Sequence, residues 1–151
     1  MLLGLLVASS ATNYLLPSGS EAAFISARVV RVIDGDTVEL ASGERVRYIG
    51  LDTPEMGEDP ECGAQEATDF NRRMVEGKPV KLLAGPEDTD DFGRLLRYVF
   101  VDDVFVNAEL VRTGQAIPRI YHPEEPFARL FAQLGQTAKA DGRGSWAHCA
   151  W

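Results

Sequence analysis

Hydrophobic and polar residues alternate in short runs from about residue 27 onward, and such alternation is typical of β-strands with one buried face. Two of these runs meet in the stretch VIDGDTVEL, residues 32–40. The dipeptide Asp34-Gly35 between them predicts a tight hairpin turn, because glycine adopts positive φ without steric cost. A turn needs only one such pair, so the second carboxylate, Asp36, requires a separate explanation.

Three further strands are predicted along the chain, over 45–51, 79–83 and 95–101. The segment Asp52-Thr53-Pro54-Glu55 ends the first of these strands, because proline cannot continue a strand ladder. The polar segment 85–91 is expected to be a loop between the other two strands.

Helical spacing of apolar residues predicts three helices, over 64–76, 107–113 and 126–140. In the first helix, Ala67 and Met74 lie on one face together with Phe70. Five short strands with three helices predict a mainly β fold, a small closed barrel of the OB type with helices attached. Such barrels host unrelated functions, so the function has to be argued from the site.

A chain of 151 residues fits one domain, which we expect to span 24–151. Residues 1–23 have a different composition. The apolar run 2–7 resembles part of a signal peptide but lacks a basic start, and it is too short to cross a membrane. It is interpreted as a signal peptide whose true start lies upstream, a lipid-free anchor stub or a disordered leader. We expect export, to the medium or the cell envelope.

Charge and cysteine content narrow the functional class. The formal net charge of -8 argues against generic nucleic-acid binding, which favours a basic face. The cysteines, Cys62 and Cys149, either form a disulfide in an oxidising compartment or are two unrelated thiols, and we expect the disulfide. Two cysteines alone cannot make a tetrahedral metal site.

Polar residues also occur where the predicted strands begin and end. Asp36 begins the second strand, and Asp52 and Thr53 end the third. Two carboxylates from adjacent strands, with one further oxygen donor, suit Ca²⁺ or Mg²⁺. Arg47 shares a strand face with residues that are apolar further along, which predicts a partly shielded guanidinium.

Two more polar residues extend this pattern. Arg94 stands at the entry to the last strand, and Glu55 follows three residues after Asp52. Shielded arginines bind phosphate oxygens well, and a carboxylate beyond a metal pair can act as a general base. Together these groups describe metal-assisted phosphodiester hydrolysis. Taken singly, each residue also has an ordinary explanation as a turn, strand-end or surface residue.

Four sequence blocks resemble those of the staphylococcal nuclease-like, or thermonuclease, family. They are Ile33-Asp34-Gly35-Asp36-Thr37-Val38, Arg47 ahead of Asp52-Thr53-Pro54-Glu55, Phe92-Gly93-Arg94, and Val106-Asn107-Ala108-Glu109-Leu110-Val111-Arg112-Thr113-Gly114. The resemblance covers about 27–146. It implies a five-stranded OB-fold barrel with three helices and a Ca²⁺-dependent endonuclease. Such an enzyme cleaves DNA and RNA to leave 3′-phosphate and 5′-hydroxyl ends.

The same resemblance implies roles for individual residues. Asp36 and Asp52 resemble the calcium carboxylates, and Thr53 resembles the residue that gives a backbone carbonyl. Glu55 resembles the carboxylate that orients or deprotonates the attacking water.

Arg47 and Arg94 resemble the pair that stabilises charge on the five-coordinate phosphate. The chain departs from the family at Asp91 and Phe92, where a lysine and a tyrosine are common. These changes put substrate affinity in doubt more than the chemistry.

The chain also departs from the family over 116–123, where the family has two tyrosines. Only Tyr121 is clearly retained there. Arg119 or Phe92 is expected to supply part of the missing base or phosphate contact.

Other function classes stay open at this point. A catalytically silent barrel that binds nucleic acid or a protein is the main alternative. A calcium-binding structural domain would leave the arginines unexplained. We expect an enzyme that acts as a monomer, without an obligate protein partner, on single-stranded or locally unwound DNA and RNA. His122 and His148 are poor candidates for catalysis, because neither has a plausible partner nearby in the sequence.

Overall fold

The structure is a computed structural model that describes residues 23–151. The predicted leader, 1–23, therefore lies outside the described residues except for Ala23. Among the described residues, no helix is both long and apolar enough to cross a membrane. The first strand begins at Ile25, and the expected domain boundary near Phe24 stays a prediction.

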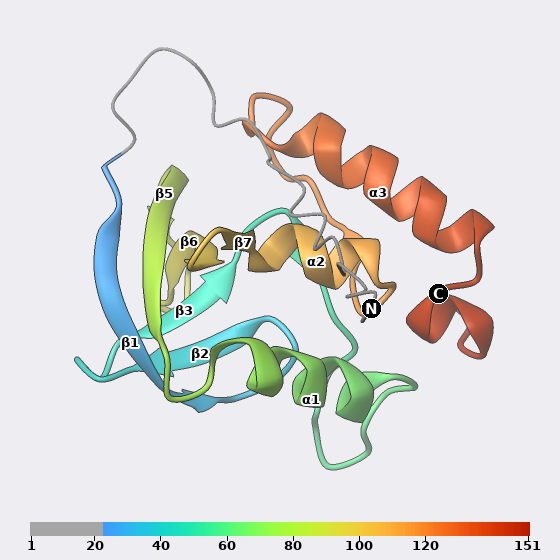
Figure 1. The fold of residues 1–151 in the computed structure, drawn as a ribbon, viewed down its shortest axis with the longest axis horizontal. Helices are drawn as coiled ribbons and strands as arrows, with labels where there is room; N and C mark the ends of the chain where they lie inside the picture. The colour runs from blue at the N-terminus through green and yellow to red at the C-terminus, as the bar shows by residue number, and fades with distance from the viewer. Residues whose placement is uncertain (1–22) are drawn as a thin grey trace, which may run out of the picture.

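Five strands wrap into a closed barrel (Figure 1). They are β1 (Ile25–Val32), β2 (Thr37–Leu40), β3 (Arg45–Tyr48), β5 (Pro79–Thr89) and β6 (Leu95–Val101). Neighbouring strands are antiparallel in the order β3-β2-β1-β5-β6, and a parallel pairing of β3 with β6 closes the barrel. Closure leaves these strands without a long exposed edge. The predicted OB-type barrel is confirmed.

The predicted strand 45–51 is wrong in its second half, because the chain turns at Gly50. This glycine has a φ of 82°, and a Cβ there would lie 2.4 Å from the ring of Phe131. Beyond the turn, β4 (Leu51–Asp52) leaves the barrel and pairs with β8 (Ile117–Pro118). A third two-residue strand, β7 (Val104–Phe105), pairs with β6.

The predicted loop 85–91 is also wrong in part, because β5 continues to Thr89. Extra residues between Ala84 and Thr89 bulge out of the ladder with β6. Bulged strands tolerate polar and glycine residues, which is why this segment reads as a loop in the sequence. The true turn covers only 90–93, with Gly93 at a φ of 76°.

The three predicted helices are present, with ends that differ by at most two residues. They are α1 (Ala64–Val75), α2 (Val106–Arg112) and α3 (Ala128–Ala140), and a short 3₁₀ turn, η1 (Gly144–Ala147), follows. Helix α2 lies between the barrel strands and α3, and α1 lies across one end of the barrel (Figure 1).

Two apolar clusters hold these elements together. One fills the barrel and reaches under α1 and α2, with Val29, Val46 and Val99 fully buried. The other is aromatic and joins β6 to α3 through Tyr98 and Phe131. On α1, Ala67 is buried as predicted, whereas Phe70 and Met74 only flank the core; its fully buried positions also include Asn71.

The C-terminus is fastened to the start of α1. In the structure Cys62 and Cys149 form a disulfide, which supports the first of the two alternatives for the cysteines. The link joins the loop before α1 to the segment that follows η1.

The β1–β2 turn needs glycine at position 35 for a different reason from the one that the sequence suggested. Gly35 does not have positive φ. It is required instead because a Cβ at this position would lie 2.7 Å from the side chain of Thr53, which is itself buried. The turn thus packs directly against the segment that follows β4.

Replacing Gly35 with alanine should therefore push Thr53 away from the turn. Because both partners are short and buried, we expect a loss of about 1–3 kcal/mol in the free energy of unfolding, measured by urea denaturation. Gly57→Ala is the matched control, since a Cβ there meets nothing within 4 Å, and it should stay within about 0.5 kcal/mol. Equal stabilities for the two variants would contradict the close approach.

Candidate active site

Asp36 is a buried carboxylate at the start of β2, with 2% of its surface exposed. Its Oδ1 accepts a hydrogen bond from the Thr37 hydroxyl at 3.1 Å, and its Oδ2 accepts one from the Thr53 backbone N–H at 3.0 Å. The Thr53 contact explains why Gly35 must lie so close to that residue. Asp36, the second carboxylate of the turn sequence, thus joins the turn to the segment after β4.

Arg47 is the positive partner of this carboxylate. On β3 it pairs in register with Thr37, which places its side chain beside Asp36. Its Nη1 forms an ion pair with Asp36 Oδ2, and its Nη2 lies 2.8 Å from Asp52 Oδ1. The side chain is 13% exposed, so the predicted partly shielded guanidinium agrees with the structure.

The pKa values of this pair move in the same direction for different reasons. Burial raises the pKa of Asp36 to about 7, against the opposing effect of Arg47. For Arg47 burial acts to lower the pKa, but Asp36 and Asp52 outweigh it and the pKa is raised. Burial dominates at Asp36 because its carboxylate lies deeper and faces one arginine, whereas Arg47 faces two carboxylates.

Asn71 fixes the turn that carries Asp36, and sequence reasoning missed it. Its amide Nδ2 donates to the backbone carbonyl of Asp34 at 3.0 Å, and its Oδ1 accepts from the Tyr48 hydroxyl at 2.9 Å. The residue is fully buried on α1. A signal was available, because Asn71 stands four residues after Ala67, on the apolar face of the predicted helix.

Glu55 lies in an exposed loop beyond Asp52. Its backbone N–H donates to the carboxylate of Glu61 at 2.9 Å, and Glu61 N–H donates back to the Glu55 carbonyl at 3.0 Å. Burial, and then the charge of Asp34, raises the pKa of Glu55, while Arg47 acts to lower it. Its carboxylate is thus close enough to Arg47 and Asp52 for their charges to act on it.

Arg94 lies at the end of the β5–β6 turn, directly before β6. Its Nε donates to Asp90 Oδ2 at 2.6 Å, and its guanidinium lies 5.4 Å from the ring centre of Phe92. Asp90 Oδ1 also accepts the backbone N–H groups of Phe92 and Arg94. Although burial acts to raise it, these bonds lower the pKa of Asp90. Asp90 is a second residue that sequence reasoning missed, and its place at the start of a turn is the usual one for aspartate.

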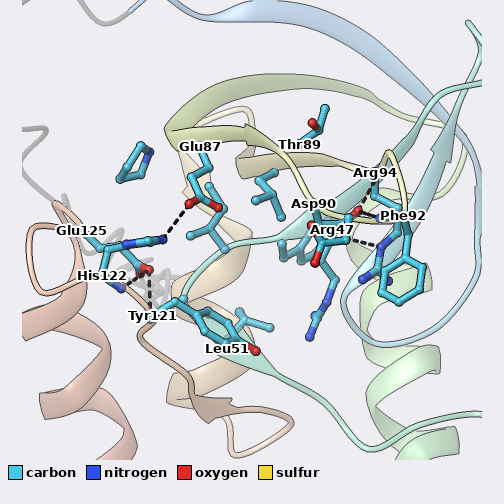
Figure 2. A pocket seen from close by; sticks show the side chains of 16 residues that line it. Arg47, Leu51, Glu87, Thr89, Asp90, Phe92, Arg94, Tyr121, His122 and Glu125 are labelled. Carbon is cyan, nitrogen blue, oxygen red and sulfur yellow. Dashed lines mark hydrogen bonds and ion pairs between the residues drawn. The ribbon is translucent and has the colours of Figure 1, made fainter.

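A cavity of about 340 Å³ lies beside these groups, and it is lined by both Arg47 and Arg94 (Figure 2). Its lining does not include the carboxylates of Asp36, Asp52 and Glu55. Arg47, Arg94 and Phe92 line one end, and Tyr121 lines the other together with His122. The volume is in the range of small-molecule sites. Four carboxylates also line it, at Glu87, Asp90, Asp91 and Glu125.

The chain matches known proteins over most of its length. The family model described as "Staphylococcal nuclease homologue" matches residues 45–148. A thermonuclease of Staphylococcus intermedius is 34% identical over 125 residues, which cover 78% of this chain and 74% of the relative. The chain belongs to the staphylococcal nuclease family.

Two further relatives are similar to this chain at slightly lower identity. A thermonuclease of Staphylococcus hyicus is 30% identical over 128 residues, covering 80% of this chain and 75% of the relative. The endonuclease YncB of Bacillus subtilis (strain 168) is 30% identical over 137 residues, covering 85% of this chain and 65% of the relative.

The segment 116–123, where this member departs from the family pattern, reaches the cavity only at Tyr121 and His122. Arg119 donates from Nε to the Tyr121 hydroxyl at 3.3 Å and lies 3.9 Å from Asp52 Oδ2. Arg119 thus lies beside Asp52 and does not line the cavity. Tyr121 and Phe92 are 68% and 84% exposed, so both rings are open to contact from outside.

Glu125 holds the Tyr121 segment in place and was missed from the sequence. Its buried Oε1 accepts the backbone N–H groups of Tyr121 and His122, each at 3.2 Å. His122 in turn lies 3.2 Å from Glu87 across the cavity (Figure 2). His122 therefore has a partner in space, which its position in the sequence did not indicate.

The carboxylates of Asp36 and Asp52 fit a hard divalent cation. Asp36 and Asp52 supply carboxylate oxygens from neighbouring segments, and both already contact a positive group, Arg47. Oxygen donors of this kind are those that Ca²⁺ binds. Thr53 approaches Asp36 through its N–H, and the expected role of its carbonyl stays a prediction.

The raised pKa of Asp36 predicts an unusual pH dependence of stability. The folded carboxyl holds its proton up to about pH 7, against 3.8 for its ordinary value, so without divalent cations the folded state loses stability as the pH rises through this window. Asp36→Asn removes this loss. Urea unfolding at pH 5 and pH 8 in chelator should show the variant gaining on the wild type at the higher pH. Asp69→Asn, at an exposed aspartate of α1, is the control, and parallel profiles for all three proteins would contradict the shift.

Proposed function

We propose that this protein is a Ca²⁺-dependent nuclease that hydrolyses phosphodiester bonds of DNA and RNA, leaving 3′-phosphate and 5′-hydroxyl ends. The observation that carries the proposal is the position of Arg47, which bridges Asp36 and Asp52 and also lines the cavity that contains Arg94. Two guanidinium groups in one cavity, one of them beside a carboxylate pair, suit a phosphate diester bound next to a cation.

Asp36, Asp52 and Thr53 are the residues that would hold Ca²⁺. When bound there, the cation supplies Lewis-acid polarisation of a phosphate oxygen and a template for the substrate. Arg47 contacts the same carboxylates, so its guanidinium and a cation compete for the same negative charge. We infer that Arg47 is released toward the cavity when the carboxylates are otherwise neutralised.

The two arginines act on the phosphate itself. Each offers several N–H donors in a fixed plane, which match the oxygens of a phosphoryl group and gain most when its charge increases in the transition state. Arg94 is oriented by Asp90 and has further donors beyond the Nε that Asp90 engages. The acidic partner keeps the guanidinium in place before the substrate arrives.

Glu55 is the proposed group that takes a proton from, or orients, the attacking water. It lies beside the cluster on a loop closed by Glu61, and its raised pKa brings it nearer to the pH at which a base works best. A base of this kind is inactive when protonated, so cleavage should decline toward acidic pH.

The cavity surroundings favour an unpaired substrate. Phe92 lies beside Arg94 and Tyr121 lines the other end of the same cavity; both rings are exposed, and such rings stack on bases that are not paired. The overall charge of -8 and the carboxylates around the cavity oppose the close approach of a long duplex. We therefore propose single-stranded or locally unwound DNA and RNA as substrates for a monomeric enzyme.

We also propose that the protein works outside the cytoplasm, secreted or bound to the cell envelope. The Cys62–Cys149 disulfide supports this, because disulfides persist mainly in oxidising compartments. The apolar run near the start of the sequence is of the kind found in exported proteins.

A cleavage assay tests the proposed activity. Purified protein with single-stranded DNA or RNA should give fragments with 3′-phosphate and 5′-hydroxyl ends in Ca²⁺, and none in a chelator. End groups are read by mass spectrometry. If no added cation supports cleavage while the protein still binds the strand, the chain is a silent binding barrel and the proposal is wrong.

Substitution of the arginines tests their roles. Arg47→Ala and Arg94→Ala should each lower kcat by about 100-fold or more, because each removes donors that act on transition-state charge. Arg31→Ala is the matched control, since Arg31 also pairs with a carboxylate, Glu39, but lies outside the cavity lining, and its kcat should be unchanged. Circular dichroism verifies that all three fold. Wild-type kcat in either cavity variant would exclude that arginine from the chemistry.

A further inference from the structure

The C-terminal segment brings together a second group of ligating side chains, at the disulfide rather than at the candidate active site. The sulfur atoms of Cys62 and Cys149 and a ring nitrogen of His148 all lie within 4.8 Å of one another. Cys62 precedes α1, whereas the other two follow η1, so the fold joins positions 87 residues apart. The two cysteines alone would be insufficient for a metal, and His148 changes that conclusion.

We propose that this group, once its disulfide is reduced, binds a Zn²⁺-class divalent cation through Cys62, Cys149 and His148. Thiolate and imidazole are the ligands that zinc prefers. Two sulfurs that are each about 2.3 Å from a tetrahedral zinc lie about 3.8 Å apart, which is within the span of this group. Three protein ligands leave the fourth position to water.

Glu66 adds an outer partner for the histidine. Its Oε1 lies 4.0 Å from His148 Nε2, and both side chains are more than half exposed and free to adjust. Zinc-bound histidines usually donate their second ring N–H to a carboxylate, which fixes the ring for ligation through the other nitrogen. Glu66 is therefore a positioning residue in this site, and Nδ1 is the ligating atom of His148.

Neighbouring contacts keep the ligands near one another without the S–S bond. Ser145 is 1% exposed, and its N–H donates to the Gly114 carbonyl at 3.0 Å. Its own carbonyl accepts the Cys149 N–H at 2.8 Å. A Cβ added at Gly63 would lie 2.2 Å from Ser145 Oγ, which shows how closely the segment packs on the start of α1. The C-terminal segment is thus held by more than its disulfide.

The chemical step requires a dithiol reductant. It delivers two electrons and two protons, so the Cys62–Cys149 bond breaks, both cysteines become thiols, and the reductant forms its own disulfide. Metal binding then displaces the two thiol protons to solvent, which leaves two thiolate ligands. The cation thereby fastens the same two segments that the disulfide fastens under oxidising conditions.

Cobalt(II) binding to the full chain tests this site. After reduction with a dithiol and removal of the reductant, the protein should bind one equivalent of Co²⁺ with a near-ultraviolet thiolate-to-cobalt band, and Zn²⁺ should displace it. The oxidised protein should show no such band. Carboxylates give no thiolate band, so the result is independent of the proposed Ca²⁺ site.

Three variants, compared with the reduced wild type, make the test specific. His148→Ala should weaken binding by more than about tenfold, and Glu66→Gln by about tenfold. His122→Ala, at the chain's one other histidine, should bind as the wild type does. Each variant keeps both cysteines, and its fold is verified in the oxidised state by near-ultraviolet circular dichroism.

Two results would overturn the proposal. One is the absence of a thiolate-to-cobalt band in the reduced wild type. This result counts even if reduction loosens the fold, because a cation bound by all three ligands should restore the folded arrangement. The other is equal affinity of His148→Ala and wild type, which would mean that only the two thiols bind.

Discussion

A carboxylate that is almost completely buried must have partners for its charge, and Asp36 determines much of the local structure for that reason. Arg47 reaches it from β3, Thr53 donates a backbone N–H, and Gly35 has no side chain because Thr53 must come this close. Asn71 then holds the turn from α1. Strand β3, the turn and the first helix therefore all contribute contacts around one buried carboxyl group.

The sequence predicts those parts of this arrangement that depend on local pattern. Strand β6 and the three helices follow from hydrophobic spacing, and Asp36, Arg47 and Asp52 stand out as polar residues at strand ends. What it does not predict depends on distant contacts. The ring of Phe131, some eighty residues later, leaves no room for a side chain at the Gly50 turn, and the role of Gly35 is visible only once Thr53 is packed against it.

The sequence also fails to predict the carboxylates that position other residues of the site. Asp90 orients Arg94, and Glu125 holds the Tyr121 segment, yet in the sequence both belong to acidic stretches that resemble solvated loops. An acidic protein that acts on polyanions must present positive charge locally, and here the arginines are held by acidic neighbours instead of being spread over a basic face. Affinity for long nucleic acids is then expected to be modest, with recognition confined to the cavity.

The central claim is that Asp36 and Asp52 form a cation site from which Arg47 is released. Anomalous diffraction from crystals grown in Ca²⁺ tests it most directly. We expect an anomalous peak within about 2.3–2.6 Å of carboxylate oxygens of both residues, with the Arg47 guanidinium turned away from them toward the cavity. The absence of a peak at saturating Ca²⁺, with Arg47 still bridging the two carboxylates, would contradict the account.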